Sequence, residues 1–406
     1  MLINNFVDSI LTYSLGIYTI AMQKRKGEIT YKDQFVGILE ETPTGGTNFT
    51  YSDQWDKNPI ACTLTEKNVG WKNGLHPFFQ NLCPEGWLRE RQSKVGRLDL
   101  RDDFGFILRF GKDCIGAIGL LPLCEPEIDS EQNDAITASI KSNKTISGAQ
   151  AKLLVYTDLG KFYPSQNKDP ATHIAKFDSN SYPDLVRNEH KSLKLAQAVI
   201  GKDKVTDFTY NVLEDKATLI VKRFDRNGNI KLRMEEFAQI LNKSSREKYD
   251  SSYECIAKGI LQYSVSPEID LLLYFKQIIF NIIIGNTDAH LKNFALLETK
   301  NGMRLSPAYD LVNTMLYYKQ GHDSRLALSL GGEKLQWSVI NRKILSDFGM
   351  NIGLKDQAVR LAFNEIKKQI IKNKKILLPS PIEEPDSFNN SYKEIVDSAC
   401  QRILIE

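Results

Sequence analysis

The residues best suited to chemistry gather in one short segment, GNTDAHLKNFALL, at positions 285–297. Asp288 and Asn293 are separated by four residues, and Asp310 follows Asn293 seventeen residues later, within SPAYDL. The D-x-x-x-x-N spacing is typical of kinase catalytic loops, in which the aspartate orients the attacking hydroxyl and the asparagine holds a metal ion. A second carboxylate at this distance suits Mg²⁺, which takes hard oxygen ligands. The alternative is a capped turn, because Asp and Asn are common in turns.

Three upstream segments add groups that phosphoryl transfer would use. TISGAQAKLLVY, at 145–156, is a loop of small residues that lets backbone N–H groups approach phosphate, and it runs into a strand with Lys152. It lacks Walker A spacing, so an ordinary loop is the alternative. THIAKF places Lys176 inside an apolar strand, where it either meets solvent or faces an anion such as a nucleotide phosphate. IVKRFDR, at 220–226, leads from a strand toward the helical half, as the adenine-binding hinge of a kinase does.

A β-rich half followed by an α-rich half must position these segments. Short apolar runs at 16–40 predict a β-hairpin with Gly27 in its charged turn, and residues 77–95 have a helical pattern. Strand-like runs then flank a helix near 188–200, in which Leu193, Ala196 and Val199 share one face. Further helices are predicted near 234–242, 252–262, 267–284, 340–348 and 354–374. This order predicts an α+β fold with two lobes.

Composition excludes several classes of protein. The 406 residues carry 53 Lys+Arg against 50 Asp+Glu, a net charge of +3, without the basic excess of a protein that lives on nucleic acid alone. The six cysteines include no CxxC pair, which argues against a zinc site and suits a reducing cytoplasm. The most apolar stretch, 271–284, is shorter than the roughly 20 residues that span a bilayer. We therefore expect a cytoplasmic protein without a membrane partner.

In this order the motifs resemble HipA-type toxin kinases of the HipA/HipB toxin–antitoxin systems. The resemblance rests on TISGAQAK, THIAKF, NEH, VKRFDR, GNTDAHLKNF and SPAYDL, which span 145–311. HPFFQNLCPEGWLRER and GKDCIGAIG extend it to the N-terminal part, although Cys83 replaces the leucine of the family's PFF-x-NLLPEG pattern. The resemblance implies a two-lobed, kinase-like fold with an N-terminal β-rich subdomain at 1–125, a small lobe at 126–225 and a helical large lobe at 226–406.

The resemblance also implies an ATP- and Mg²⁺-dependent protein serine/threonine kinase. Family members phosphorylate an aminoacyl-tRNA synthetase, which arrests translation, and are regulated by a HipB-like antitoxin through which they meet DNA only indirectly. By position, Asp288 matches the catalytic base, and Asn293 and Asp310 match the metal ligands. The nucleotide-binding positions are the glycine-rich loop at Ser147, Gly148, Ala149, Gln150, Ala151 and Lys152, the phosphate-binding Lys176, the hinge at Lys222, Arg223 and Phe224, and also His290, Lys292 and Tyr309. His290 has an alternative interpretation as a turn histidine bonded to backbone.

Regulation is where the sequence departs from the family. Family members are silenced by autophosphorylation of a serine that opens the glycine-rich loop, but here the loop opens with Thr145 and continues to Ser147. Either hydroxyl can accept phosphate, and about two added negative charges beside a triphosphate site should repel ATP.

Two other functions stay open on the sequence. One is a metal-dependent hydrolase that uses Asp288, His290 and Asp310, although it leaves the glycine-rich loop and Lys176 without a role. The other is a catalytically minor co-repressor that partners a DNA-binding antitoxin. A lysine-rich run at 364–377 is either the solvated face of a helix or a patch that contacts the DNA backbone in an antitoxin complex.

Overall fold

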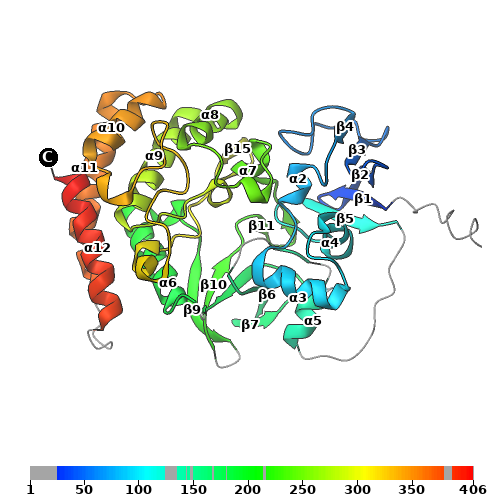
Figure 1. The fold of residues 1–406 in the computed structure, drawn as a ribbon, viewed down its shortest axis with the longest axis horizontal. Helices are drawn as coiled ribbons and strands as arrows, with labels where there is room; N and C mark the ends of the chain where they lie inside the picture. The colour runs from blue at the N-terminus through cyan, green and yellow to red at the C-terminus, as the bar shows by residue number, and fades with distance from the viewer. Residues whose placement is uncertain are drawn as a thin grey trace, which may run out of the picture.

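The computed structural model describes residues 25–123, 135–142, 144–146, 150–166, 169–179, 181–213, 216–378 and 386–405. Figure 1 shows an N-terminal sheet at one end of the molecule, a second sheet beside it, and a helical region that finishes with α12 at the opposite edge. Residues 147–149 of the predicted glycine-rich loop, and residues 16–24 of the predicted hairpin, lie outside the described residues.

The N-terminal sheet is antiparallel, with strand order β4-β3-β2-β1-β5. Its strands are β1 (Lys26–Tyr31), β2 (Gln34–Glu41), β3 (Thr47–Tyr51), β4 (Asn68–Trp71) and β5 (Ile118–Pro122). Three helices accompany it: α2 (Pro77–Gln80), α3 (Gly86–Gly96) and α4 (Asp103–Phe110). Apolar side chains from the strands and from α2 and α4, including Phe49, Phe79 and Ile107, form a separate core for this part of the chain.

A hairpin is present in this region, but it is not the predicted one: the predicted first strand at 16–22 lies outside the described residues, and Gly27, predicted in the turn, lies in a strand. β1 and β2 join at Lys32 and Asp33, whose φ angles are 51° and 62°. Two central residues with positive φ form a turn whose twist matches that of the flanking strands. Gly27 instead lies within β1, where an added Cβ would come within 2.7 Å of the Leu120 side chain. The glycine therefore allows close packing rather than chain reversal.

The second sheet carries the two candidate phosphate-binding lysines. It is antiparallel, with strand order β7-β6-β8-β10-β9. Its strands are β6 (Lys152–Asp158), β7 (Lys161–Pro164), β8 (His173–Phe177), β9 (Phe208–Leu213) and β10 (Lys216–Lys222). Helix α6 (Leu185–Val199) contacts β8, β9 and β10, and α5 (Ala135–Lys141) contacts β6 and β7. The cross-strand register pairs Lys152 with Lys176, so both side chains lie on the same face of the sheet.

The helical region is built around α9 (Pro267–Ile283), which begins with proline at its first turn and is followed by Gly285 at φ 71°. Most of its residues are buried in the main hydrophobic core, among them Phe275, Ile279 and Phe280. The other helices are α7 (Phe237–Ile240), α8 (Tyr253–Tyr263), α10 (Arg342–Asn351), α11 (Asp356–Asn373) and α12 (Ser387–Leu404). Strands β13 (Met234–Glu236), β14 (Ala295–Thr299) and β15 (Gly302–Leu305) form a small sheet beside them, and β11 (Arg226–Asn227) pairs with β12 (Ile230–Lys231).

Two helix predictions need correction. The segment predicted as one helix at 77–95 is divided into α2 and α3, because Pro84 lies between them and cannot continue a helix. The helix predicted from residue 234 starts only at Phe237, since Met234–Glu236 pair with β14 as a strand. Helix α12 was absent from the predicted set. Of the helices in the described ranges, none combines the length and apolarity needed to cross a membrane.

Candidate active site

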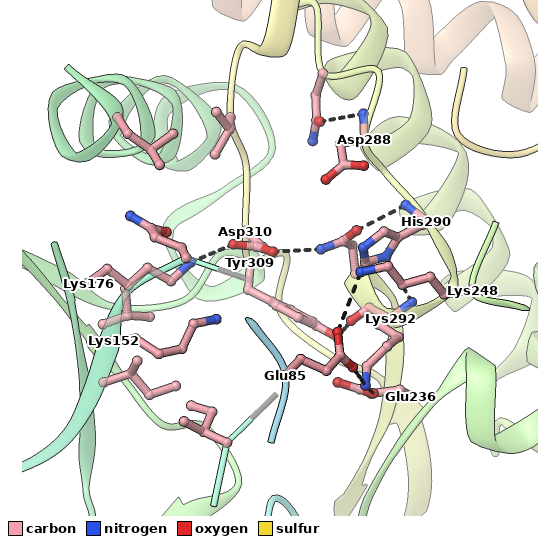
Figure 2. A pocket seen from close by; sticks show the side chains of 18 of the residues that line it. Glu85, Lys152, Lys176, Glu236, Lys248, Asp288, His290, Lys292, Tyr309 and Asp310 are labelled. Atoms are coloured by element: carbon pink, nitrogen blue, oxygen red, sulfur yellow. Dashed lines mark hydrogen bonds and ion pairs between the residues drawn. The ribbon is translucent and has the colours of Figure 1, made fainter. Parts of the chain in front are cut away.

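One pocket of about 450 Å³ brings the scattered motifs together. It is lined by the second sheet, the segment after β10, the loop that precedes β14, and residues of the N-terminal part (Figure 2). The sequence-predicted residues that line it are Gln150, Lys152, Lys176, Lys222, Arg223, Phe224, Asp288, His290, Lys292, Asn293, Tyr309 and Asp310. They come from segments up to 160 positions apart in the sequence.

Lys176 is buried and ion-paired, so the interpretation of a solvent-exposed strand lysine is wrong. Its ammonium lies 2.6 Å from Glu189 of α6 and 2.5 Å from Asp310. Burial alone would lower the pKa of Lys176, but the two carboxylates outweigh burial and raise it. Burial likewise opposes ionisation of Asp310, yet Lys176 and Lys152 hold the pKa of that carboxyl well below its usual range. Both groups are therefore charged at neutral pH.

Lys152 adds a second positive charge on the same face. Its side chain is 6% exposed and lines the pocket from β6, next to Lys176 on β8. Burial, together with the charge of Lys176, lowers the pKa of Lys152 to about 8. Two neighbouring lysines in a pocket are an arrangement that an anion such as phosphate would stabilise.

The loop that follows α9 closes with a short helical turn that fixes Asn293. In the turn Leu291–Asn293, the Asn293 side chain accepts a hydrogen bond from the His290 N–H at 3.0 Å. Its amide nitrogen also donates to Asp310 at 2.8 Å. Asp310 has φ 57°, a left-handed conformation that is uncommon for a residue with a side chain and that often marks functional sites. The two predicted metal ligands therefore contact each other directly.

His290 has the geometry of the turn histidine. Its Nδ1 accepts a hydrogen bond from the Lys292 N–H at 3.2 Å, and its ring packs edge-on against Tyr249. Burial lowers the pKa of His290 to about 3, so the imidazole is neutral. The ring also lines the pocket, so contact with a nucleotide stays a prediction.

Asp288 lies across the pocket from the lysines and is bound by Tyr249. The Tyr249 hydroxyl donates to Oδ1 of Asp288 at 2.9 Å. Burial raises the pKa of Asp288, while this hydrogen bond and the charges of Lys248 and His322 oppose the increase. Asp288 is therefore held at the pocket wall, where its ionised form can accept a proton from a hydroxyl.

Two side chains of the candidate hinge, those of Phe224 and Arg223, make contacts with different parts of the chain. Phe224 packs against the ring of Tyr309 with centroids 5.4 Å apart, and Tyr309 donates to the carbonyl of Lys292 at 2.8 Å. Arg223, in contrast, is buried, and its guanidinium binds the neighbouring Asp225 and the carbonyl of Cys114 in the N-terminal part. A contact between Arg223 and a nucleotide would therefore use its backbone.

Of the two candidate autophosphorylation sites, Thr145 lies among the described residues and Ser147 does not. Thr145 is 1% exposed, and its hydroxyl oxygen has no hydrogen-bond partner among the described residues. Ser147, Gly148 and Ala149 lie outside those residues. Gln150 donates to the carbonyl of Phe177, and Ala151 accepts from the N–H of Phe177, so the end of the loop is tied to β8. Phosphorylation of Thr145 would require its segment to move.

Several carboxylates and one tyrosine at the site were not predicted: Glu85, Glu189, Glu236 and Tyr249. A signal existed for Glu189, since it lies four residues before Leu193 on the apolar face of α6, where a carboxylate needs a buried partner. Glu85 pairs with Lys292 across a sequence separation of 207 residues, so spacing gave no indication of it.

Two other expectations can be compared with the structure. Within the described ranges, no group of three His, Cys, Asp or Glu residues is arranged to hold a metal ion. The lysine-rich run lies on and after α11, and its members are exposed, as expected for a solvated helix face: Lys367, Lys368, Lys372, Lys374 and Lys375. Its contact with DNA stays a prediction.

Comparison with known proteins identifies relatives along most of the chain. The model of the HipA-like C-terminal domain matches residues 144–374, and that of the HipA N-terminal domain matches residues 27–121. The chain is 25% identical to the serine/threonine-protein kinase toxin HipA of Shewanella oneidensis over 93% of this chain and 95% of that protein. It is 27% identical to the putative kinase Y4mE of Sinorhizobium fredii over 73% of this chain and 79% of that protein.

A solved structure supports the fold. The chain matches one in the complex of HipA, HipB and operator DNA from Shewanella oneidensis with a TM-score of 0.76 and 23% identity, covering 93% of this chain and 97% of the other. The predicted α+β, two-lobed kinase-like fold with an N-terminal β-rich subdomain is thus confirmed.

Proposed function

Because this chain belongs to the HipA family of kinases, we propose that it transfers the γ-phosphate of ATP to a serine or threonine hydroxyl of a protein. The observation that carries the proposal is the convergence of Lys176, Asp288 and Asp310 on one pocket. These groups supply what phosphoryl transfer needs: positive charge for phosphate, a carboxylate for the acceptor hydroxyl, and a ligand for a metal ion.

The metal would be held by Asn293 and Asp310. Asp310 is ionised, and the amide oxygen of Asn293, which accepts one hydrogen bond from the His290 N–H, keeps a second lone pair. Both are hard oxygen donors of the kind that Mg²⁺ prefers. Mg²⁺, when bound, would neutralise negative charge on the phosphate oxygens. Lys176 and Lys152 would face those oxygens from the sheet, and Lys176 is already oriented by Glu189.

Asp288 would act on the acceptor. It would orient the hydroxyl and take its proton as the oxygen bonds to the γ-phosphorus, the bond to the β-γ bridging oxygen breaks and ADP leaves. Most of the rate enhancement would come from positioning and charge neutralisation, since the protein has no covalent role.

The regulatory partners are also proposals. The HipA chain in the structurally similar complex is bound to HipB and operator DNA, which supports a HipB-like antitoxin as partner here, with DNA met through it. An aminoacyl-tRNA synthetase is the proposed target, on the family resemblance alone. Thr145 and Ser147 are the proposed autophosphorylation sites, to be distinguished by phosphopeptide mapping after incubation with ATP.

The assignment of Asp288 can be tested directly. We expect Asp288→Ala to retain stabilisation by ATP with Mg²⁺ in thermal unfolding and to lose phosphate transfer by about three orders of magnitude or more. Phosphoproteomes of cells that express either form would identify the target. If Asp288→Asn proved as toxic as the wild type, toxicity would not arise from phosphoryl transfer, and the co-repressor function would be favoured.

A further inference from the structure

The catalytic loop is anchored in the N-terminal subdomain, defined here as residues 25–123, by one lysine. Lys292 directly precedes Asn293, but its side chain leaves the loop and is 5% exposed. Its ammonium lies 2.6 Å from Oε1 of Glu85 and donates to the carbonyl of Asn81 at 3.2 Å. Figure 2 shows Glu85 and Lys292 meeting at the side of the pocket opposite Asp288. A subdomain without any of the kinase motifs thus contributes a carboxylate to the pocket.

The backbone of Lys292 is central to the geometry of the site. Its N–H donates to His290, and its carbonyl accepts from the hydroxyl of Tyr309. The next residue, Asn293, is bonded to Asp310. A shift of Lys292 would therefore move both proposed metal ligands, one through the chain and the other through Tyr309, its neighbour.

Glu85 also connects a second segment to this anchor. Oε2 of Glu85 lies 3.6 Å from the ammonium of Lys248, and the backbone carbonyl of Lys248 accepts from the N–H of Leu291. Glu236 completes the cluster at 3.4 Å from Lys292. Burial raises the pKa of Glu236 to about 7, whereas Lys292 and Lys248 outweigh burial at Glu85 and lower its pKa to about 2. Glu85 is therefore the ionised carboxylate of the cluster, and it contacts both lysines.

The position of Glu85 is itself rigidly supported. It immediately precedes α3 and follows α2, and the residues at the end of α2 bind the segment that leads to Lys248. Asn81 donates to the carbonyl of Lys243 at 2.8 Å, and Gln80 both accepts from the backbone N–H of Ser245 and donates to its hydroxyl. The corner between α2 and α3 is therefore a platform for the catalytic loop.

We propose that Glu85 is a positioning residue of the kinase, through which the N-terminal subdomain fixes Lys292 and thereby the Asn293–Asp310 pair. The inference rests on the proposed function and deepens it. Glu85 does not bind the phosphates, since a carboxylate would repel them. It holds the loop that carries the metal ligands, as supporting residues around metal sites do.

The test compares Glu85→Gln with Lys32→Gln in the full chain. Lys32 lies 2.7 Å from Glu298 of β14, so it also joins the N-terminal subdomain to the large lobe, but neither residue lines the pocket. We expect Glu85→Gln to raise the Mg²⁺ concentration for half-maximal activity, and to lower kcat, by about 10- to 100-fold. Lys32→Gln should change both by less than about twofold, since it breaks a partly exposed pair.

The same comparison has a readout that needs no phosphate transfer. The Mg²⁺ dependence of ATP-induced thermal stabilisation should move to higher Mg²⁺ in Glu85→Gln and stay unchanged in Lys32→Gln. If the wild type binds ATP with Mg²⁺ but transfers no phosphate, the proposed function fails. The Mg²⁺ dependence of ATP binding would still show whether Glu85 positions the metal ligands. Glu85→Asp, with a shorter carboxylate, should shift the Mg²⁺ dependence in the same direction by less, and it covers the case in which Glu85→Gln does not fold. An unchanged Mg²⁺ dependence, or equal effects in the Glu85 and Lys32 variants, would overturn the proposal.

Discussion

At the scale of single residues, the pocket depends on pairs in which one group sets the charge or orientation of another. Asp310 is ionised because Lys176 faces it, and Lys176 is fixed because Glu189 faces it in turn. The sequence motifs predicted residues that line this pocket and to which we assign roles in the proposed reaction. They did not predict partners such as Glu85 and Tyr249, because these roles depend on contacts between segments and not on spacing.

Tyr249 gives the residue-scale prediction, which concerns pH. Asp288 must be ionised to accept a proton, so activity falls as pH drops through its pKa. The Tyr249 hydrogen bond and the charges of Lys248 and His322 lower that pKa against burial and the charge of Asp310. Tyr249→Phe removes the hydrogen bond, so the acid limb of kcat/KM should move to higher pH.

A neighbouring tyrosine provides the control for this shift. Tyr253 also donates a hydrogen bond near the site, but to the backbone carbonyl of Ala289 rather than to a carboxylate. Tyr253→Phe should lower stability by about 1 kcal/mol and leave the acid limb in place. If the acid limb of kcat/KM moved to lower pH in Tyr249→Phe, or moved equally in both variants, the hydrogen bond from Tyr249 would not be what lowers the pKa of Asp288.

At the scale of elements, the periodicity of apolar residues correctly predicted helices whose position is determined by the local sequence. The helices near 252–262, 267–284 and 340–348 are found as α8, α9 and α10, because each has a continuous apolar face that packs in the main core. Met234–Glu236 was predicted as helix because its pairing with β14 is sixty residues distant in sequence. Gly27 was assigned to a turn because its packing against Leu120 of β5 has no local signature. The predictions of secondary structure were therefore correct where local contacts determine the conformation. They were wrong where pairing or packing with a distant strand determines it.

At the scale of the whole molecule, a buried ion cluster joins the N-terminal subdomain to the segment that follows β10, the candidate hinge. Asp225 accepts hydrogen bonds from Arg223, Arg226 and the N–H of Gly116. Arg226 continues the cluster to Asp113 at 2.7 Å. The boundaries near 125 and 225 stay predictions, but this cluster shows that residues 113–116 are held against residues 223–226 by buried charges.

The cluster predicts a large loss of stability in Asp225→Asn. Both arginines would lose a charged partner while remaining buried, which costs about 3–5 kcal/mol. Burial opposes ionisation of Asp225, but Arg223 and Arg226 lower its pKa to about 2. Its stabilisation is therefore complete above its unfolded pKa of about 4 and lost as pH falls toward 2.

Urea unfolding at neutral pH would measure this loss. Asp347→Asn is the matched control, since Asp347 pairs with Lys343 on an exposed helix face and should change stability by at most about 1 kcal/mol. Equal, small effects in both variants would mean that the cluster contributes little to the folded state.

The strand register that places Lys152 beside Lys176 also means that the Lys152 amine can take up a proton when a ligand binds in the pocket. With a pKa of about 8, Lys152 is only partly protonated in mildly alkaline solution, and an anion bound beside it would raise that pKa. Nucleotide binding near pH 8 should then take up a fraction of a proton from the medium. Calorimetric titration in buffers of different ionisation enthalpy would report the uptake as a buffer-dependent heat, and Lys152→Met should abolish it. Equal heats in every buffer would show that Lys152 is already charged before the ligand arrives.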